Sequence, residues 1–338
     1  MRHTLCTVLV FSLLLLCITI PPAKALHASQ DPGLQWSSTN RISYSVRCSL
    51  GLFEGRSREQ NYGGSALGLE YQDHKLSELK WDISEVVMAG IVFSCAMGRF
   101  GFNGGAWNAL NHGDGEMQDY DWLLVDYEWT NYSRHDVDVT EAYIYDLNIT
   151  YLLLQKPLYE MRAIFGFKKE FWHWTDKMYE FVYPLYYAND RGFRGNMGGL
   201  HTIDYEQSFE IPYFGLMASG IEDSLTDVTF DGKTDTIEWS AYALYSTRVT
   251  AKATDHHVER GLQSEYDFED GRSLLLGGSG TYRFTPSVFA TISLTYQRIS
   301  RIRGDRKLMD ENGTRFIIDG GGISQHVIMA SFAIGYLF

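Results

Sequence analysis

Apolar and polar residues alternate with a period of two along much of the chain. Every second position from Tyr143 to Leu153 is apolar, whereas Asp146, Asn148 and Thr150 stand among the positions between them. The pattern returns at the C-terminal end, where the even positions from 328 to 338 are apolar. Because successive side chains of a strand point to opposite faces, this spacing predicts β-strands with one apolar face.

The apolar faces favour a membrane barrel over a soluble β-sandwich, whose strands also alternate. They are unusually continuous and end in Tyr, Trp or Phe, as expected where a barrel meets the two surfaces of a membrane. The last residue, Phe338, belongs to such an apolar face, which is typical of outer-membrane barrels. Beyond the N-terminal segment, no apolar run is long enough for a membrane helix.

The predicted fold class is all-β: a transmembrane antiparallel β-barrel of about ten strands, with short periplasmic turns and long extracellular loops. The barrel must close because an open edge would leave unpaired backbone amides in lipid. The strands are expected at 41–54, 74–84, 86–99, 139–154, 159–175, 205–219, 226–249, 271–284, 287–302 and 324–338. Short turns are expected at 82–86, 155–158, 220–224 and 285–287, and long loops at 55–73, 100–138, 176–204, 250–270 and 303–323.

The N-terminal segment has the three parts of a secretory signal peptide. Arg2 precedes an apolar run over residues 5–20, and Ala23-Lys24-Ala25 supplies a cleavage site of the small-x-small type. We therefore expect a signal peptide over residues 1–25, followed by a barrel domain over residues 26–338 in the outer membrane.

Charge and composition exclude two classes of protein. The chain has 29 Lys and Arg against 42 Asp and Glu, and its formal net charge of −13 is opposite in sign to that of a nucleic-acid-binding protein. Aromatic residues make up 14% of the chain, too many for a disordered protein. On a barrel scaffold, chemistry is expected in the long loops and at the strand tips that carry them.

Two acidic residues, Asp119 and Asp121, are the first candidate for chemistry. In an extended segment they share one face at a separation of about 6–7 Å. Like charges at that separation raise the pKa of one carboxyl, which suits a base or a shared proton. The alternative, a solvated acidic turn, stays open on the residues alone.

The second candidate is the pair Asp255 and His257, which share a face in the same way. A carboxylate beside an imidazole orients the ring and keeps it available as a base near neutral pH. The alternative is a surface histidine with an acidic neighbour. No metal site is expected, because the chain has neither an HExxH motif nor a spaced set of cysteines, and no GxSxG turn presents a serine nucleophile.

Eight short segments resemble the omptins, a family of outer-membrane endopeptidases of Gram-negative bacteria. They occur in the family's order and extend over nearly the whole mature chain. They are GRSRE at 55–59, SELKW at 77–81, QDYDW at 118–122, SRH at 133–135, YDLNI at 145–149, GFR at 192–194, PYFGL at 212–216 and the pair Asp255 and His257.

The resemblance implies a catalytic site at the extracellular mouth of the barrel. Asp119 and Asp121 would form one catalytic couple, and Asp255 with His257 the other. A water molecule between them would attack the peptide bond, and His257 and Asp119 would take its proton while Asp121 assists with charge balance. No acyl-enzyme and no cofactor are therefore expected.

The resemblance also gives an expected substrate class. Glu59 and His135 are expected to bind substrate, and Glu59 matches the buried acid that receives a basic side chain. Two further acidic positions of the family read Asn131 and Ala253 here, so the preference for basic residues is expected to be less strict. Peptides and exposed loops of proteins are the expected partners of a monomeric enzyme, without any nucleic acid.

The family also requires lipopolysaccharide, which is held by an aromatic, an acidic and several basic residues on the outer wall. Here the corresponding segment, residues 167–171, reads FKKEF, and a further basic position reads Ser208. The resembling contacts are largely absent, so a requirement for lipopolysaccharide stays open. Lys168 or Lys169 is the remaining candidate for a lipid phosphate.

A non-enzymatic barrel of the same fold, acting as an adhesin or a structural protein, is the alternative function. Retention of all four catalytic positions and of His135 favours the protease. A lipid hydrolase is a weaker alternative, because the sequence shows no Ser–His pair.

One strand conflicts with this site. Its odd positions from 237 to 245 are apolar, and the same phase would direct Asp255 and His257, which are also odd, away from the barrel interior. A β-bulge adds one residue and reverses the facing of all later side chains. We therefore expect a bulge or break within 246–254, and the carboxylates of Asp119 and Asp255 facing one another across a water-filled gap.

Overall fold

The computed structural model describes residues 42–63, 73–123, 128–184, 191–222 and 237–338. The predicted signal peptide, residues 1–25, therefore lies outside the described residues. The described residues form twelve strands and one short 3-10 turn. None of them forms a helix that is long and apolar enough to span a membrane.

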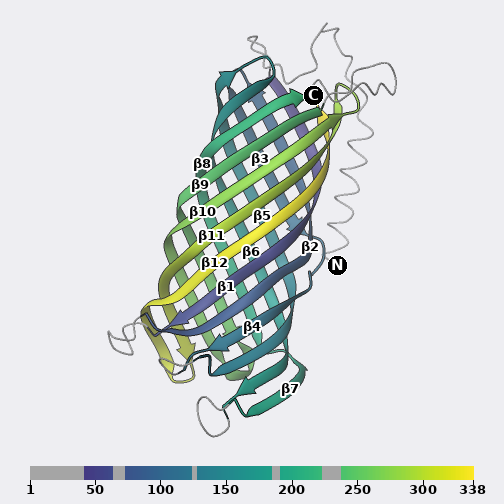
Figure 1. The fold of residues 1–338 in the computed structure, drawn as a ribbon. Coiled ribbons are helices and arrows are strands. Elements are labelled where there is room, and N and C mark those ends of the chain that lie inside the picture. Colours follow the sequence, from purple (N-terminus) through teal and green to yellow (C-terminus); the bar gives the residue numbers. More distant parts are fainter. Residues whose placement is uncertain (1–41, 64–72, 124–127, 185–190, 223–236) are drawn as a thin grey trace.

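The strands form one closed antiparallel sheet around a barrel (Figure 1). They are β1 (Ile42–Tyr62), β2 (Lys75–Met97), β3 (Phe100–Ala109), β4 (Gly115–Asp121), β5 (Asn131–Gln155), β6 (Tyr159–Tyr183), β7 (Phe193–Leu200), β8 (Ile203–Glu222), β9 (Ile237–His257), β10 (Leu262–Arg283), β11 (Val288–Asp310) and β12 (Gly313–Leu337). The ring closes where β1 pairs with β12.

Two barrel strands are each made of two segments. β3 and β4 follow one another along β2, and β7 and β8 follow one another along β6. Counting each of these two pairs once reduces the twelve segments to ten barrel strands. The predicted all-β antiparallel barrel of about ten strands is therefore confirmed.

The predicted turn at 82–86 is wrong, because β2 runs through it without interruption. Two residues of β2, Ser84 and Glu85, lie opposite the single residue Glu54 of β1, and Glu85 has a φ of 54°. This is a β-bulge, whose polar residues resemble a turn in the sequence. The real turn follows Met97, where Gly98 has a φ of 57°, and so β3 and β4 occupy much of the predicted loop at 100–138.

The described parts of the other predicted long loops are also mostly strands. The connection between β9 and β10 is the turn Val258–Arg260 with Gly261, and β11 and β12 are joined by only Glu311 and Asn312. The predicted short turns at 155–158 and 285–287 are confirmed, whereas the one at 220–224 runs into residues outside those described. The barrel walls therefore continue well beyond the membrane as a rim of strands.

A band of exposed apolar side chains surrounds the barrel. It includes Tyr44, Leu50, Leu52, Phe93, Phe102, Leu147, Phe165, Leu216, Leu276, Leu294 and Phe332. On β1 the band ends at Leu52, and the outward positions beyond it are Glu54, Arg56 and Arg58. The band matches the surface that a barrel presents to lipid. β4 and β7 lie beyond it, at the end of the barrel opposite the C-terminus (Figure 1).

Aromatic side chains fill the barrel next to this rim. The rings of Trp81 and Tyr205 stack with centroids 4.8 Å apart, and Trp174 packs against both. All three are fully buried. Trp81 lies two residues from Leu79, which is the register partner of Asp119. The aromatic core thus fixes the strands that carry the candidate acids.

A β-bulge interrupts β9 where the sequence predicted one. Thr247 and Arg248 of β9 lie opposite Arg272 of β10. Ser246 before the bulge and Val249 after it are both buried, although regular alternation would put them on opposite faces. The predicted break of phase on this strand is therefore confirmed.

Candidate active site

Asp255 and His257 lie at the end of β9, and the bulge directs them into the barrel. Asp255 is 1% exposed, and its Oδ2 lies 3.1 Å from Nε2 of His257. Burial on its own would lower the pKa of His257, but the charge and hydrogen bond of Asp255 outweigh it, so the pKa is raised. The imidazole is oriented by its carboxylate partner, as a general base requires.

Asp119 and Asp121 lie on β4 and face the barrel interior from another wall. Asp119 is the register partner of Leu79 on β2 and of Ser133 on β5. Ser77 donates a hydrogen bond of 3.4 Å from Oγ to Oδ1 of Asp119. Burial, followed by the charge of Asp121, raises the pKa of Asp119 well above its usual value, and burial also raises the pKa of Asp121. The pair therefore holds a proton more tightly than two solvated carboxyls.

The two couples influence one another across the mouth. After burial and the charge of Asp121, the pKa of Asp119 is lowered by the charge of His257 and raised by that of Asp255. β4 and β9 are separated by β5, β6 and β8 on the shorter way around the ring. A proton-holding acid pair thus stands opposite an imidazole–carboxylate couple, which is the combination needed to add water to a carbonyl group.

Arg260 is a cation at this site that the sequence reasoning missed. It belongs to the 3-10 turn that follows β9, three residues after His257. Its charge lowers the pKa of Asp121, for which only the opposing effect of burial is larger. It also lowers the pKa of Asp119 and His257, where burial and the other charged neighbours have larger effects. It also forms a side-chain hydrogen bond with Tyr183. The only feature of the sequence that could have indicated its role is its position in the turn between β9 and β10, close to His257.

Glu59 lies on β1, inside the barrel and 1% exposed. The hydroxyl oxygen of Tyr266 is 2.7 Å from Oε1 of Glu59 and 2.8 Å from Oδ1 of Asn61. Burial, and next the charge of Asp255, raises the pKa of Glu59 to about 8. Oε2 of Glu59 has no hydrogen-bond partner among the described residues, so this carboxyl has capacity for another donor.

The two positions that differ from the acids of the family also line this region. Asn131 is the register partner of Asp121 and hydrogen-bonds to its carboxylate, which lowers the pKa that burial raises. Ala253 is 4% exposed and is the register partner of Tyr266. Neither adds a second negative charge beside Glu59.

His135 on β5 is 2% exposed, and protein groups occupy both of its ring nitrogens. Nε2 lies 2.7 Å from Oγ of Ser133, and Nδ1 bonds to the carboxylate of Asp176 on β6. Both ring nitrogens are therefore used within the protein, and contact of His135 with substrate stays a prediction.

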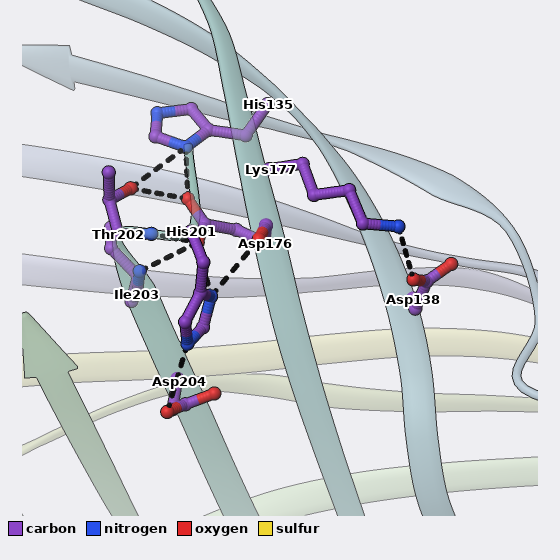
Figure 2. A network of polar contacts seen from close by, with 8 residues as sticks. All are labelled: His135, Asp138, Asp176, Lys177, His201, Thr202, Ile203 and Asp204. Carbon is purple, nitrogen blue, oxygen red and sulfur yellow. Dashed lines mark hydrogen bonds and ion pairs between the residues drawn. The ribbon is translucent and has the colours of Figure 1, made fainter. Parts of the chain in front are cut away.

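Asp176, which the sequence reasoning missed, joins β6 to the start of β8 (Figure 2). Its carboxylate accepts bonds from the backbone N–H groups of Thr202 and Ile203, at 2.7 and 2.6 Å, and from the hydroxyl of Thr202. Burial would raise the pKa of Asp176, but these bonds and that of His135 outweigh it and lower the pKa. The carboxylate thus fixes His135, and through it Ser133.

Comparisons with known proteins agree with this architecture. Residues 40–338 match the sequence profile of the Omptin family. The chain is 27% identical over 303 residues to the plasminogen activator of Yersinia pestis, covering 88% of this chain and 90% of that protein. It is 26% identical over 321 residues to protease 7 of Escherichia coli O157:H7, covering 90% and 94%. The crystal structure of the outer-membrane protease OmpT from Escherichia coli superposes with a TM-score of 0.79 at 22% identity, covering 89% of this chain and 99% of that one.

Proposed function

The chain belongs to the omptin family of outer-membrane proteases, and from this premise we propose that it hydrolyses peptide bonds with a water molecule activated by His257. Membership of a protease family sets aside the adhesin and the structural barrel considered above. The observation that carries the proposal is the electrostatic contact between two unlike couples, one holding a proton and one centred on an imidazole.

In the proposed reaction, the couple of Asp255 and His257 accepts a proton and the couple of Asp119 and Asp121 donates one. Neutral His257 takes a proton from water as the oxygen adds to the substrate carbonyl carbon, and Asp255 stabilises the resulting imidazolium. The proton shared by Asp119 and Asp121 then passes to the leaving nitrogen as the C–N bond breaks. Return of the proton from His257 to the aspartate pair restores the enzyme.

Glu59 is proposed to select the substrate. The charge of Asp255 acts on its buried carboxyl, which supports a place for Glu59 near the proposed catalytic couple. A guanidinium or ammonium group is the donor that such a carboxylate binds best. With an asparagine at 131 and an alanine at 253, one charge rather than several recognises the substrate. Peptides with a neutral side chain at this position are therefore expected to be cleaved as well.

A second mechanism, with a serine nucleophile, has to be considered. Hydrogen bonds connect Ser133 to His135 and His135 to Asp176, as in the catalytic triad of a serine protease. A serine nucleophile also needs free N–H donors for the oxyanion. Ser133 lies in a strand that is paired on both sides, opposite Asp119 and Phe181, and is 4% exposed. The water mechanism is therefore preferred, and His135 is proposed to position Ser133 against the wall that carries Asp119.

The test is cleavage of a mixed peptide library by refolded protein, read by mass spectrometry. His257→Ala is expected to lower the rate by about 10²–10⁴. His256→Ala is the matched control, because it removes a neighbouring imidazole on the opposite face of β9. Near-normal turnover of the His257 variant, or covalent labelling of Ser133 by a serine-directed phosphonate with loss of activity, would overturn the mechanism.

A further inference from the structure

Basic side chains form a row on the outer wall made by β1, β12 and β11. In the strand register, Arg56 lies directly opposite His326, and His326 lies directly opposite Arg298. Opposed residues of antiparallel strands have Cβ atoms about 4.5–5.5 Å apart, and like charges in such positions repel. Arg56 and Arg298 therefore both stand beside His326, and an external anion would stabilise their two charges.

A second row stands beside the first, farther from the lipid-facing band. Arg58 lies opposite Lys80 of β2, and both contribute to one continuous surface with Arg56. Glu78 lies 3.9 Å from Lys80 and partly balances it. Together, the basic wall patch consists of Arg56, Arg58, Lys80, Arg298 and His326.

The acids near the patch leave much of its charge unbalanced. Asp82 accepts a bond of 2.7 Å from Nε of Arg56. Glu54, which accepts a bond from the backbone N–H of Glu85, adds one further negative charge beside the patch. In the described part of the chain, the exposed side chains of Arg58 and Arg298 form neither an ion pair nor a hydrogen bond. This concentration of positive charge contrasts with the net charge of −13 of the whole chain.

The charges of the patch act on the pKa of His326. Burial, followed by the charges of Arg58, Arg56 and Arg298, lowers the pKa of this imidazole, and the charge of Asp82 opposes them only weakly. The three guanidinium groups therefore act on one point from two sides, as they would on the oxygens of a bound anion.

The patch stands immediately above the apolar band. One step toward the band, the outward positions on the same three strands are Glu54, Ile328 and Tyr296. One step farther they are Leu52, Ala330 and Leu294, of which the two leucines are 45% and 59% exposed. The patch is therefore at the depth of lipid headgroups, on the side of the membrane where the active site lies.

The wall with the family's lipid-binding segment offers no comparable site. Lys168 turns into the barrel, where it pairs with Glu170 and bonds to Gln297 at 2.7 Å. Lys169 faces outward, but it pairs with Glu210 at 3.0 Å. Neither lysine has the unbalanced charge of the basic wall patch.

We propose that the basic wall patch binds the phosphate groups of a phosphorylated lipid in the adjacent leaflet. Guanidinium groups bind phosphate through paired hydrogen bonds, and several of them in register suit a headgroup with more than one phosphate. The acyl chains of the same lipid would lie along Leu52, Ile328 and Leu294. This site is independent of the proposed catalytic mechanism.

The test measures binding of diphosphorylated lipid A and of its dephosphorylated form to the full-length refolded protein in detergent, by native mass spectrometry. The wild type is expected to prefer the phosphorylated lipid. The triple variant Arg56→Gln, Arg58→Gln and Arg298→Gln is expected to lose at least about tenfold of that preference, as for the loss of charge-assisted hydrogen bonds. Because the substitutions relieve repulsion on an exposed surface, the barrel should fold, which circular dichroism checks.

The matched control removes three other outward cations that are paired with acids, by Lys177→Gln, Lys252→Gln and Lys307→Gln. It is expected to keep the preference of the wild type. Equal binding of the two lipids, a preference unchanged in the arginine variant, or full competition by inorganic phosphate at the same concentration would each overturn the proposal. The last result would identify a site for free anions.

Discussion

The hydroxyl oxygen of Tyr266 lies 2.7 Å from Oε1 of Glu59 and 2.8 Å from Oδ1 of Asn61. A phenol has a single proton to donate, so it satisfies both acceptors only if one of them also carries a proton. Burial, followed by the charge of Asp255, raises the pKa of Glu59 to about 8, so most of this carboxyl is protonated near neutral pH. The pocket is thus mostly neutral until a cation enters or the pH rises.

The preference for a basic substrate side chain should therefore depend on pH. The ratio of kcat/KM for an arginine peptide to that for its neutral citrulline analogue is expected to rise roughly tenfold per pH unit below the pKa of Glu59. It should level off above a pH of about 8, where the carboxyl is already ionised. Taking a ratio cancels the ionisation of the catalytic groups, since both peptides need them.

Glu59→Gln should make this ratio small and independent of pH, because the amide cannot ionise. The control is Gln60→Glu, which adds a carboxyl at the next position of β1, on the opposite face of the strand. A ratio that still rises with pH in the Glu59 variant would show that another group receives the basic side chain.

Removing the charge of Arg260 should move the whole pH profile of kcat/KM to higher pH. Arg260 lowers the pKa of His257, so Arg260→Ala should raise that pKa and shift the acidic limb upward. It also lowers the pKa of Asp119 and Asp121, so the basic limb, where the pair loses its proton, should shift in the same direction.

The neighbouring substitution Glu259→Gln changes the charge of the same turn and is the control for a general effect of charge on the profile. It is expected to leave both limbs close to those of the wild type. If only one limb of the pH profile moves in the Arg260 variant, the couple assigned to the other limb does not have the proposed role in the reaction.

The sequence was sufficient for the fold class because lipid demands an apolar outer face. Beyond the band this demand ends: on β1, Arg56 and Arg58 face outward while Ser57 and Glu59 face inward, so both faces are polar although the strand continues. Alternation of polarity then disappears without any change in backbone pairing. This is why the described parts of the predicted long loops are mostly strands.

The candidate site was predictable only where its residues are close in sequence. Asp255 and His257 are two residues apart, and a conflict of phase was enough to predict the bulge that directs them inward. Asp176, in contrast, bonds to His135 across 41 positions, and nothing in the sequence near either residue indicates the contact. Pairing of β5 with β6 creates it.

Replacing Asp176 should lower the stability of the folded barrel. Asp176→Asn removes the charge that holds His135, Thr202 and Ile203, and is expected to lower the free energy of unfolding by about 1–3 kcal/mol near neutral pH. The pKa of Asp176 is depressed in the folded protein, so its contribution is complete above the unfolded pKa and is lost as the pH falls through the folded value. The difference from the wild type, measured by urea unfolding in detergent, should therefore shrink in acid.

Asp138→Asn is the matched control for Asp176, since it breaks only an exposed ion pair with Lys177 at 3.0 Å (Figure 2). Its unfolding free energy should stay within about 0.5 kcal/mol of the wild type at every pH. If Asp176→Asn behaves in the same way, the buried network does not hold β6 and β8 together.

The bulge on β9 should be essential for cleavage because it alone sets the facing of the end of this strand. Deleting Arg248 removes the extra residue, so regular pairing with Arg272 would turn Asp255 and His257 outward. We expect a folded barrel whose peptide cleavage is lower by about 10² or more.

Arg248→Ala, which keeps the residue count, should leave cleavage near that of the wild type. Adding one alanine after Thr250 to the deletion variant should turn the pair inward again and recover part of the activity. Normal cleavage by the deletion variant would mean that the facing of this couple does not depend on the bulge.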